Sequence, residues 1–561
     1  MPLQNSDAIQ NNNAFQNNDP IHRPVTWLVL VSILEAAIFY AHVQLQIAPI
    51  YPQVFDQLSY MTATDNIIDD FARRGIVAFA QPFLSPLSTG ITYPVQGALA
   101  VLALGSSRAA LLTVNLIYFL AAQTSLFFTA RRVGGEWQSA WVALAVFIAC
   151  IGLFKKAGGI ADYRIDFAAM CLFGIWVCAL SWTDNFTSRT FSVVAGLIAG
   201  SLVLMRFITA AYIGPILIIL LFYVALSKRK DNPHTFTRMI NWLISGLLVA
   251  VLAVPELFRA MQTIKDYYVA GHLNGDEPAI RATEVGVSTF AGHLIFYPKA
   301  LMSFQIGTIG MIVIVAIMIA GIVAKLRQPR DWTFSFDVFV FLTALIVPML
   351  ILTLDVSKSP VVIGIVLVPV ALLVCGVWHV LVASDFSPSR LRWFLYCLIF
   401  VGVIGFAAHA ASNRFEVSPQ DQLEIRRLNI AMGDYGATRG CARLAFDRLT
   451  DYLNGATVRY YFRQGHREAN AGPVFTQSLG GIFSIPREAA LAAIRSSDVV
   501  VLSDKTLKRG ASPFEASIVA YWDAIDEYAA NNLSLLTTGI INDIHFRIFV
   551  RPDQVRCDVR P

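Results

Sequence analysis

The sequence predicts a polytopic α-helical membrane protein that carries a soluble α/β domain at its C-terminal end. Of its 561 residues, 56% are hydrophobic and 14% are charged. A typical soluble protein has about 25% charged residues, so this composition favours a membrane protein. Apolar runs long enough to cross a bilayer recur through residues 1–411, and shorter runs interspersed with charges follow them. The formal net charge is only +5, and no basic, aromatic-rich stripe in the sequence indicates a nucleic-acid partner.

Residues 1–24 are polar and rich in Asn and Gln, which is typical of a disordered tail. The segment 25–48 is too long for the hydrophobic region of a signal peptide and lacks a convincing small-residue cleavage site, so it is predicted to remain as a span. About eleven spans are predicted from apolar length, at 25–48, 108–130, 137–154, 166–182, 191–206, 208–227, 239–258, 300–324, 335–354, 360–383 and 393–411. Those at 166–182 and 191–206 are short for a full crossing.

The distribution of Lys and Arg predicts the orientation of these spans. Four basic loops fall on one side, which the positive-inside rule makes cytoplasmic. They contain Arg131/Arg132, Lys228/Arg229/Lys230/Arg238, Lys325/Arg327/Arg330 and Arg390/Arg392. Lys155/Lys156 is the one outside pair that runs against the rule. We therefore expect a protein of the cell inner membrane with a cytoplasmic N-terminus and a periplasmic C-terminal domain.

The first outside loop, 49–107, concentrates acidic residues. Apolar residues at helical spacing predict an amphipathic helix at 57–74 that ends at Gly75. Asp56 precedes this helix, so it is either an N-cap or a functional carboxylate at the membrane surface. The apolar piece 95–104 is too short to span the bilayer and is predicted to lie in the interface.

Other outside segments add charges on the same side. Asp162, Arg164 and Asp166 surround the start of a span, where they either form a capping surface cluster or face the same cavity as Asp56. Arg206 lies at the outside end of a helical hairpin, where an arginine binds a phosphate or reaches toward the interface. The loop 259–299 gathers polar and aromatic groups, each of which is either a membrane anchor or part of a binding site: His272, Asp276, Glu277, Arg281, His293, Tyr297 and Lys299.

Residues 412–561 alternate between strand and helix patterns, which predicts a small α/β domain. The expected strands are 458–463, 498–503 and 545–550, and the expected helices are 444–453 and 514–530. Cys441 and Cys557 are the two of the seven cysteines that fall in this domain, and in an oxidising compartment they could form a disulfide. No cluster of His and Cys in the sequence indicates zinc.

The order of these features resembles the GT-C superfamily of membrane glycosyltransferases, and most closely its branch of protein O-mannosyltransferases and lipid A aminoarabinose transferases. The resemblance covers roughly residues 25–411 and rests on order and topology, because no single motif is long. The residues that carry it are Asp56 with Tyr60, Thr92-Tyr93-Pro94, Leu104-Gly105 with Arg108, Arg131-Arg132-Val133-Gly134, Tyr163-Arg164-Ile165-Asp166-Phe167 and Arg206.

The resemblance implies a GT-C-like fold and an inverting transfer of a sugar from a polyprenyl-phosphate donor to a lipid, glycan or protein acceptor. Asp56 would be the catalytic base, with Asp162 or Asp166 orienting the acceptor. Arg206, Arg281 and Lys299 would bind the donor phosphate. Tyr60, Tyr163, His272 and Tyr297 are the candidates for contacts with the acceptor or sugar. Gln57 stands where the superfamily often has a second acid, which favours a metal-independent reaction without a cofactor.

Two other functions remain open at this stage. A non-enzymatic lipid or sugar transporter would share the apolar composition, although the absence of an internal repeat weakens this hypothesis. A polysaccharide polymerase or ligase would use a related lipid-linked donor.

Overall fold

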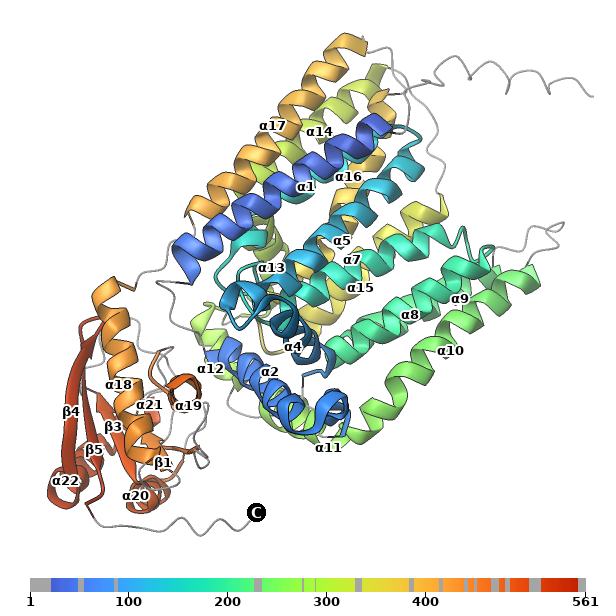
Figure 1. The fold of residues 1–561 in the computed structure, drawn as a ribbon. Helices are drawn as coiled ribbons and strands as arrows, with labels where there is room; N and C mark the ends of the chain where they lie inside the picture. The colour runs from blue at the N-terminus through green and yellow to red at the C-terminus, as the bar shows by residue number, and fades with distance from the viewer. Residues whose placement is uncertain are drawn as a thin grey trace, which may run out of the picture.

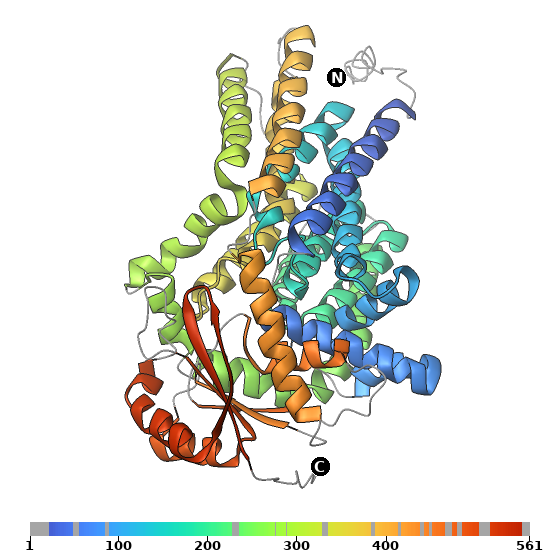
Figure 2. The same cartoon turned by 60° about the vertical axis from the view of Figure 1, so that its left-hand side comes forward.

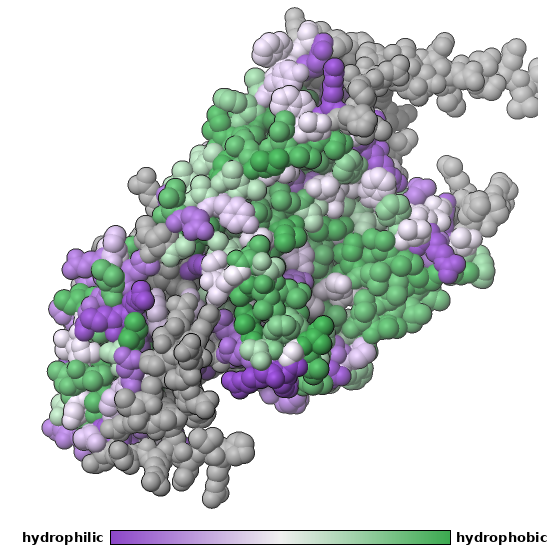
Figure 3. Space-filling view, in the orientation of Figure 1, coloured by the Kyte–Doolittle hydropathy of each residue, from purple (hydrophilic) through white to green (hydrophobic). Residues whose placement is uncertain are grey.

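The computed structural model describes residues 22–48, 55–84, 89–226, 235–274, 277–287, 289–327, 335–382, 388–412, 417–437, 442–447, 452–465, 474–479, 485–503 and 516–552. A body of long helices carries a small α/β domain at one end (Figure 1). Apolar side chains cover the visible face of the helical body between more polar ends (Figure 3). This distribution is the one expected of a body that lies in a bilayer.

Nine helices among the described residues are long and apolar enough to cross a membrane. They are α1 (His22–His42), α5 (Arg108–Gly134), α7 (Ile165–Trp182), α9 (Ala210–Leu226), α10 (Thr235–Arg259), α13 with α14 (Phe290–Ala300 and Gly307–Arg327), α15 (Phe336–Leu354), α16 (Leu367–Val382) and α17 (Pro388–Ser412). The other two predicted spans are the shorter helices α6 (Trp137–Ile148) and α8 (Arg189–Met205). Helix α6 has 12 residues and is buried along most of its length, so its apolar sequence reflects burial within the bundle.

The segment 49–107, predicted as the first outside loop, is mainly helical in its described parts, which include the predicted amphipathic helix. Helix α2 (Phe55–Arg74) is followed by a 3₁₀ turn (Gly75–Ala80), α3 (Gln81–Leu84) and α4 (Thr92–Leu104). Gly75 has φ +64°, the left-handed conformation that commonly ends a helix. The apolar face of α2 packs on α4, and Asp70 pairs with Arg74 on its outer face at 2.6 Å. The amphipathic pattern of α2 therefore fixes this helix against α4.

The segment 259–299, predicted as an outside loop, is also helical in its described parts. It contains α11 (Met261–Ile264), a π-helix (Lys265–Leu273) and α12 (Glu277–Glu284). The i→i+5 hydrogen bonding of a π-helix is rare and is frequently found at functional sites. The segment 355–361 then connects α15 to a 3₁₀ turn (Val362–Val366) that precedes α16.

The C-terminal domain is built on a five-stranded mixed sheet with the order β2-β1-β3-β5-β4. Strands β1 (Ala442–Phe446), β2 (Val474–Ser478) and β3 (Val499–Ser503) are parallel, and β4 (Ser534–Ile541) and β5 (Ile544–Val550) are antiparallel neighbours. The domain's other elements are α18 (Pro419–Ala437), α19 (Gly455–Gly465), α20 (Arg487–Ser496), α21 (Ala516–Val519) and α22 (Trp522–Asn532). The α/β class and the strands at 498–503 and 545–550 are confirmed, and the helix predicted at 514–530 is present as α21 and α22.

Two predictions in this domain are wrong. The expected helix at 444–453 begins as strand β1, because Leu444 and Phe446 face one core while Ala445 faces the other; a strand buried on both faces has a continuous apolar run. The expected strand at 458–463 lies in α19. There Val458 packs into the domain and Tyr460 packs against the helical body, so tertiary contacts override the strand propensity of aromatic residues.

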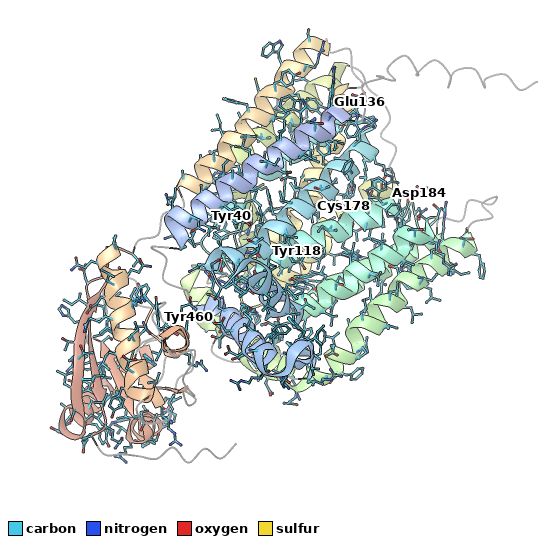
Figure 4. All side chains as sticks on the ribbon, viewed as in Figure 1. Tyr40, Tyr118, Glu136, Cys178, Asp184 and Tyr460 are labelled. Carbon is cyan, nitrogen blue, oxygen red and sulfur yellow. The ribbon has the colours of Figure 1, made fainter. Side chains whose placement is uncertain are left out.

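The C-terminal domain contacts the helical body through α19, which packs against α2. Figures 1 and 2 both place the domain at the end of the body where α2 lies. Tyr460 lies on the side of the domain that faces the body (Figure 4) and is buried there. The helix that carries Asp56 is thus supported by both parts of the protein.

Candidate active site

A cavity of about 390 Å³ opens at the end of the helical body that includes α2. Its lining comes from α2, the start of α7, the junction of α8 and α9, the π-helix with α12, and the segment 352–362. All of these segments lie in outside loops, or at outside ends of spans, in the topology predicted from the sequence. The cavity therefore brings together polar and charged side chains from segments that are far apart in the chain.

Arg164 connects the first two acidic residues of the site. Its Nη1 donates to Asp56 Oδ2 at 2.8 Å, and its Nε lies 2.8 Å from Asp162 Oδ2. Asp162 is buried, and its carboxylate also accepts a hydrogen bond from the Gly158 N–H at 2.6 Å. Burial raises the pKa of Asp162, and the charge of Arg164 opposes that shift. Arg164 is thus contacted on its buried side by Asp162 and on the cavity side by Asp56.

Asp166 and Arg206 form the second charge pair of the site. Asp166 lies in the first turn of α7, and Arg206 lies at the break between α8 and the 3₁₀ turn Phe207–Thr209 that leads into α9. Arg206 Nη1 donates to Asp166 Oδ1, and both side chains line the cavity. A guanidinium has five N–H donors, so Arg206 keeps donors for an anion while it holds Asp166.

Thr89 and Gly90 fix the position of the break that carries Arg206. Phe207 N–H donates to Thr89 O at 3.0 Å, and Thr89 Oγ1 accepts from Tyr60 at 3.1 Å. A Cβ on Gly90 would lie 1.8 Å from the carbonyl oxygen of Met205. Gly90 is therefore needed for this close approach of two chain segments.

Behind the charges lies a buried polar network that positions the loop 155–165. Tyr163 packs on Tyr93 with ring centroids 4.8 Å apart, and its hydroxyl lies 2.9 Å from Thr64 Oγ1. Tyr93 donates to Asn115 Oδ1 at 2.8 Å, and Asn115 donates to the carbonyl of Asp162 at 2.8 Å. This network holds Asp162, and hence Arg164, in a fixed place relative to α4 and α5.

Gln57 and Asp56 are adjacent in the chain but differ in their surroundings. Gln57 is buried, and its Oε1 accepts from Arg108 at 2.6 Å. Asp56 lies in the first turn of α2, and its carboxylate lines the cavity. Asp56 therefore combines a position at the positive end of the helix dipole with access to the site.

Tyrosine, histidine and serine side chains supply the rest of the cavity lining. Tyr267, Tyr268 and His272 come from the π-helix, whose hydrogen bonds join residues five apart. His272 Nε2 lies 3.4 Å from Asp355 Oδ2. Other lining residues of this kind are Tyr60, Tyr212, Ser357 and Ser359. Aromatic faces with adjacent hydroxyls suit a ligand that is both ring-shaped and polar.

The residues proposed from the sequence divide into four groups. Those that line the cavity are Asp56, Tyr60, Asp166, Arg206, His272 and Arg281. Those buried behind it are Asp162, Tyr163 and Tyr297. Lys299 is exposed on α13 and is not among the residues that line the cavity. Cys441, Cys557 and Asp276 lie outside the described residues, as does the side chain of Glu277.

Sequence reasoning missed several lining residues, including Thr89, Tyr212, Asp355, Ser357 and Ser359. The signal for the last three was the polar run Asp355–Ser359 between two apolar spans. Such a run is expected in any turn outside the membrane, so it did not indicate a binding segment.

The charged groups of the cavity neutralise each other largely through arginine–carboxylate contacts. In the described part of the chain, no group of three or more His, Cys, Asp or Glu side chains could hold a metal ion. Metal independence stays a prediction, supported by the positions of Arg164 and Arg206 against the carboxylates of Asp56 and Asp166.

Comparisons with known proteins give a structural likeness without a sequence match. No family model and no curated protein matches the sequence. The structure is similar to ArnT from Cupriavidus metallidurans in the apo state, with a TM-score of 0.59 and 10% identity over 93% of this chain and 98% of that one. ArnT bound to undecaprenyl phosphate gives a TM-score of 0.56 at 10% identity, with the same coverage of 93% and 98%. The Archaeoglobus fulgidus oligosaccharyltransferase gives 0.50 at 12% identity, over 85% of this chain and 69% of that one.

ArnT and the oligosaccharyltransferase are both membrane glycosyltransferases of the GT-C fold. The chain therefore has the GT-C fold, as its sequence features predict. Its nine long apolar helices among the described residues make it a multi-pass membrane protein. At 10 to 12% identity, the likeness establishes the fold alone.

Proposed function

We propose that this protein is an inverting glycosyltransferase that moves a sugar from a polyprenyl-phosphate donor to an acceptor at the outer face of the inner membrane. The observation that carries the proposal is the meeting of Asp56, Asp166, Arg164 and Arg206 in one cavity at the end of a membrane-spanning body. The GT-C fold supports it, as does the ArnT structure with bound undecaprenyl phosphate.

Asp56 is the proposed general base. Its side chain is 55% exposed, whereas that of Asp166 is 16% exposed, so an incoming acceptor reaches Asp56 more easily. Arg164 contacts only its Oδ2. Asp56 takes the proton of the acceptor hydroxyl as that oxygen attacks the anomeric carbon. The bond between the anomeric carbon and the phosphate oxygen breaks on the opposite side, which inverts the configuration.

The leaving phosphate needs positive charge and no proton donor. Arg206 and Arg164 are the proposed cations, and Arg281 lines the same cavity. Guanidinium groups bind phosphate through paired, charge-assisted hydrogen bonds, which strengthen as the leaving oxygen gains charge. Asp162 acts through Arg164 rather than on the substrate, because its carboxylate lies behind the cavity wall.

The test is a transfer assay with the full-length protein in liposomes. Polyprenyl-phosphate sugars, with hexoses and pentoses in turn, are mixed with membrane-extract acceptors, and mass spectrometry measures release of the bare polyprenyl phosphate. We expect enzyme-dependent and acceptor-dependent release with at least one donor. Movement of the intact donor between leaflets, without release of the bare lipid from any donor, would instead identify a transporter.

A further inference from the structure

The segment from Asp355 to Val361 presents alternate residues to the cavity. Asp355, Ser357, Ser359 and Val361 all line it, whereas Lys358 does not. The segment is irregular, with bends at residues 356–357 and 360–361. Four residues of this connection thus face the site, whereas Lys358 is buried in the protein interior and Val356 is exposed.

Lys358 anchors the interior side. It is only 1% exposed, which is rare for a lysine. Its ammonium donates to the carbonyl oxygens of Leu352, Thr353 and Asp355 at 3.1, 2.8 and 2.5 Å. Its three donors therefore satisfy carbonyls at the C-terminal end of α15, where the helix dipole favours a positive charge.

Two other interior side chains hold the same segment. Gln305 Nε2 donates to the carbonyls of Pro360 and Val361 at 3.0 and 3.1 Å. The Ser359 N–H donates to the hydroxyl of Tyr297 at 3.3 Å, and the Lys358 ammonium lies 5.1 Å from the centre of the Tyr297 ring. Contacts of this kind fix a binding segment before its ligand arrives.

The cavity side of the segment presents an oriented carboxylate. The Ser357 N–H donates to Asp355 Oδ1 at 3.0 Å, and His272 Nε2 lies 3.4 Å from Asp355 Oδ2. Ser357 Oγ also donates to the His272 carbonyl at 2.8 Å, which ties the segment to the π-helix. Among the described residues, the ion-pair partner recorded for Asp355 is this histidine rather than an arginine.

We propose that Asp355, Ser357 and Ser359 bind hydroxyl groups of the sugar that is transferred, and that Lys358 is the residue that positions them. This inference rests on the proposed function and specifies where the sugar binds. A carboxylate repels a phosphate but accepts hydrogen bonds from sugar hydroxyls, and serine hydroxyls both donate and accept. The two ends of the donor therefore bind at different places: its phosphate binds to Arg164 and Arg206, and its sugar binds to the Asp355 segment.

The test compares two lipids on the purified full-length protein. Undecaprenyl phosphate reports on the phosphate site, and undecaprenyl-phosphate sugars, tried as a panel of hexoses and pentoses, report on both sites. We expect Asp355→Asn, a change of nearly equal size, to weaken binding of the preferred sugar-linked lipid roughly tenfold or more, because a hydrogen bond to a charged acceptor is stronger than one to a neutral acceptor. Binding of undecaprenyl phosphate should be unchanged.

Lys358→Met tests the positioning role. Leaving three carbonyls without their donor should raise the KM for the sugar-linked donor more than it lowers kcat, with binding of undecaprenyl phosphate retained as evidence of folding. Lys156→Met, at an exposed lysine on the loop 155–165, is the matched control and should change neither quantity.

The outcomes separate the two proposals. Equal weakening of both lipids by Asp355→Asn, or no change in either, would overturn the sugar-binding inference. So would a wild-type protein that binds no sugar-linked lipid of the panel more tightly than undecaprenyl phosphate. Failure of the wild-type protein to bind any of these lipids would instead count against the glycosyltransferase proposal itself.

Discussion

The carboxylates of the cavity are held in two different ways, in an arginine cluster (Asp56, Asp166, Arg164 and Arg206) and in a serine cluster (Asp355, Ser357 and Ser359). In the arginine cluster, Asp56 and Asp166 each contact a guanidinium, from Arg164 and Arg206. In the serine cluster, Asp355 is held by a backbone N–H and a histidine. The first arrangement leaves guanidinium N–H donors for an anion, and the second leaves hydrogen-bond acceptors for a neutral polar group. The difference shows how one cavity can bind both ends of a sugar phosphate.

The largest effect that distinguishes the two clusters is expected at Arg206. Arg206→Ala should lower kcat about 10²–10³-fold, because it removes a cation from the leaving phosphate. Arg206→Ala should also weaken the binding of undecaprenyl phosphate, whereas Asp355→Asn should leave that binding unchanged. Steady-state rates and lipid binding measure both effects. Arg189→Ala, at the exposed start of α8, is the control, and an equal loss there would show that the effect is not specific to the site.

A smaller effect is expected where the arginine cluster depends on a glycine. Gly90→Ala places a Cβ 1.8 Å from the Met205 carbonyl, so the junction that carries Arg206 must move. We expect transfer to fall about 100-fold, as a displacement of about 1 Å does to other enzymes. Gly214→Ala, in α9, meets no atom within 4 Å and should leave transfer and thermal stability unchanged. A fully active Gly90→Ala protein would contradict the close packing of this junction.

The smallest effect concerns pH and separates Asp162 from the carboxylates that line the cavity. Burial raises the pKa of Asp162, so the folded protein takes up this proton at a higher pH than the unfolded chain does. By linkage, this group alone makes the fold more stable as the pH falls through the folded pKa. The same protonation weakens the hold on Arg164, so transfer should decline over that range.

The Asp162→Asn variant tests this pH effect. Its transfer rate should be severalfold lower than that of the wild type at neutral pH. The rate should also fall less steeply as the pH is lowered, because the carboxyl group that titrates has been removed. Rate–pH profiles and thermal unfolding at each pH measure the two parts. An acid limb that is identical in both proteins would assign the titration to another group.

The arginine cluster was accessible to sequence reasoning and the serine cluster was not. Charged residues at the ends of long apolar runs stand out, and the positive-inside rule places Asp56, Asp166 and Arg206 on one side of the membrane. That Asp162 lies behind Arg164 depends on the buried network of Tyr163 and Asn115, which has no local signal in the sequence.

The serine cluster could not be predicted from the sequence because a short polar run between two apolar spans normally indicates a turn. Polar residues such as Asp355 and Ser357 are expected wherever a chain turns outside the bilayer. That they face the cavity depends instead on the hydrogen bonds by which Lys358 and Gln305 hold the backbone of this segment, and these contacts leave no pattern in the sequence. The π-helical hydrogen bonding of the segment that includes His272 likewise cannot be recognised from the spacing of apolar residues. In the C-terminal domain, short apolar runs do not distinguish strand from helix, which accounts for the two exchanged elements.

The central claim is that Asp56 is the base of a glycosyl transfer, and replacing it tests the claim most directly. Asp56→Asn keeps the size of the side chain but cannot take a proton, and a general base typically contributes about 10²–10⁴-fold to the rate. Asp70→Asn, on the outer face of the same helix, is the matched control. The account predicts that single-turnover transfer from a bound donor falls by at least 100-fold in Asp56→Asn, with donor binding retained, and is unchanged in Asp70→Asn. Transfer within a factor of about two of the wild type in Asp56→Asn would contradict it.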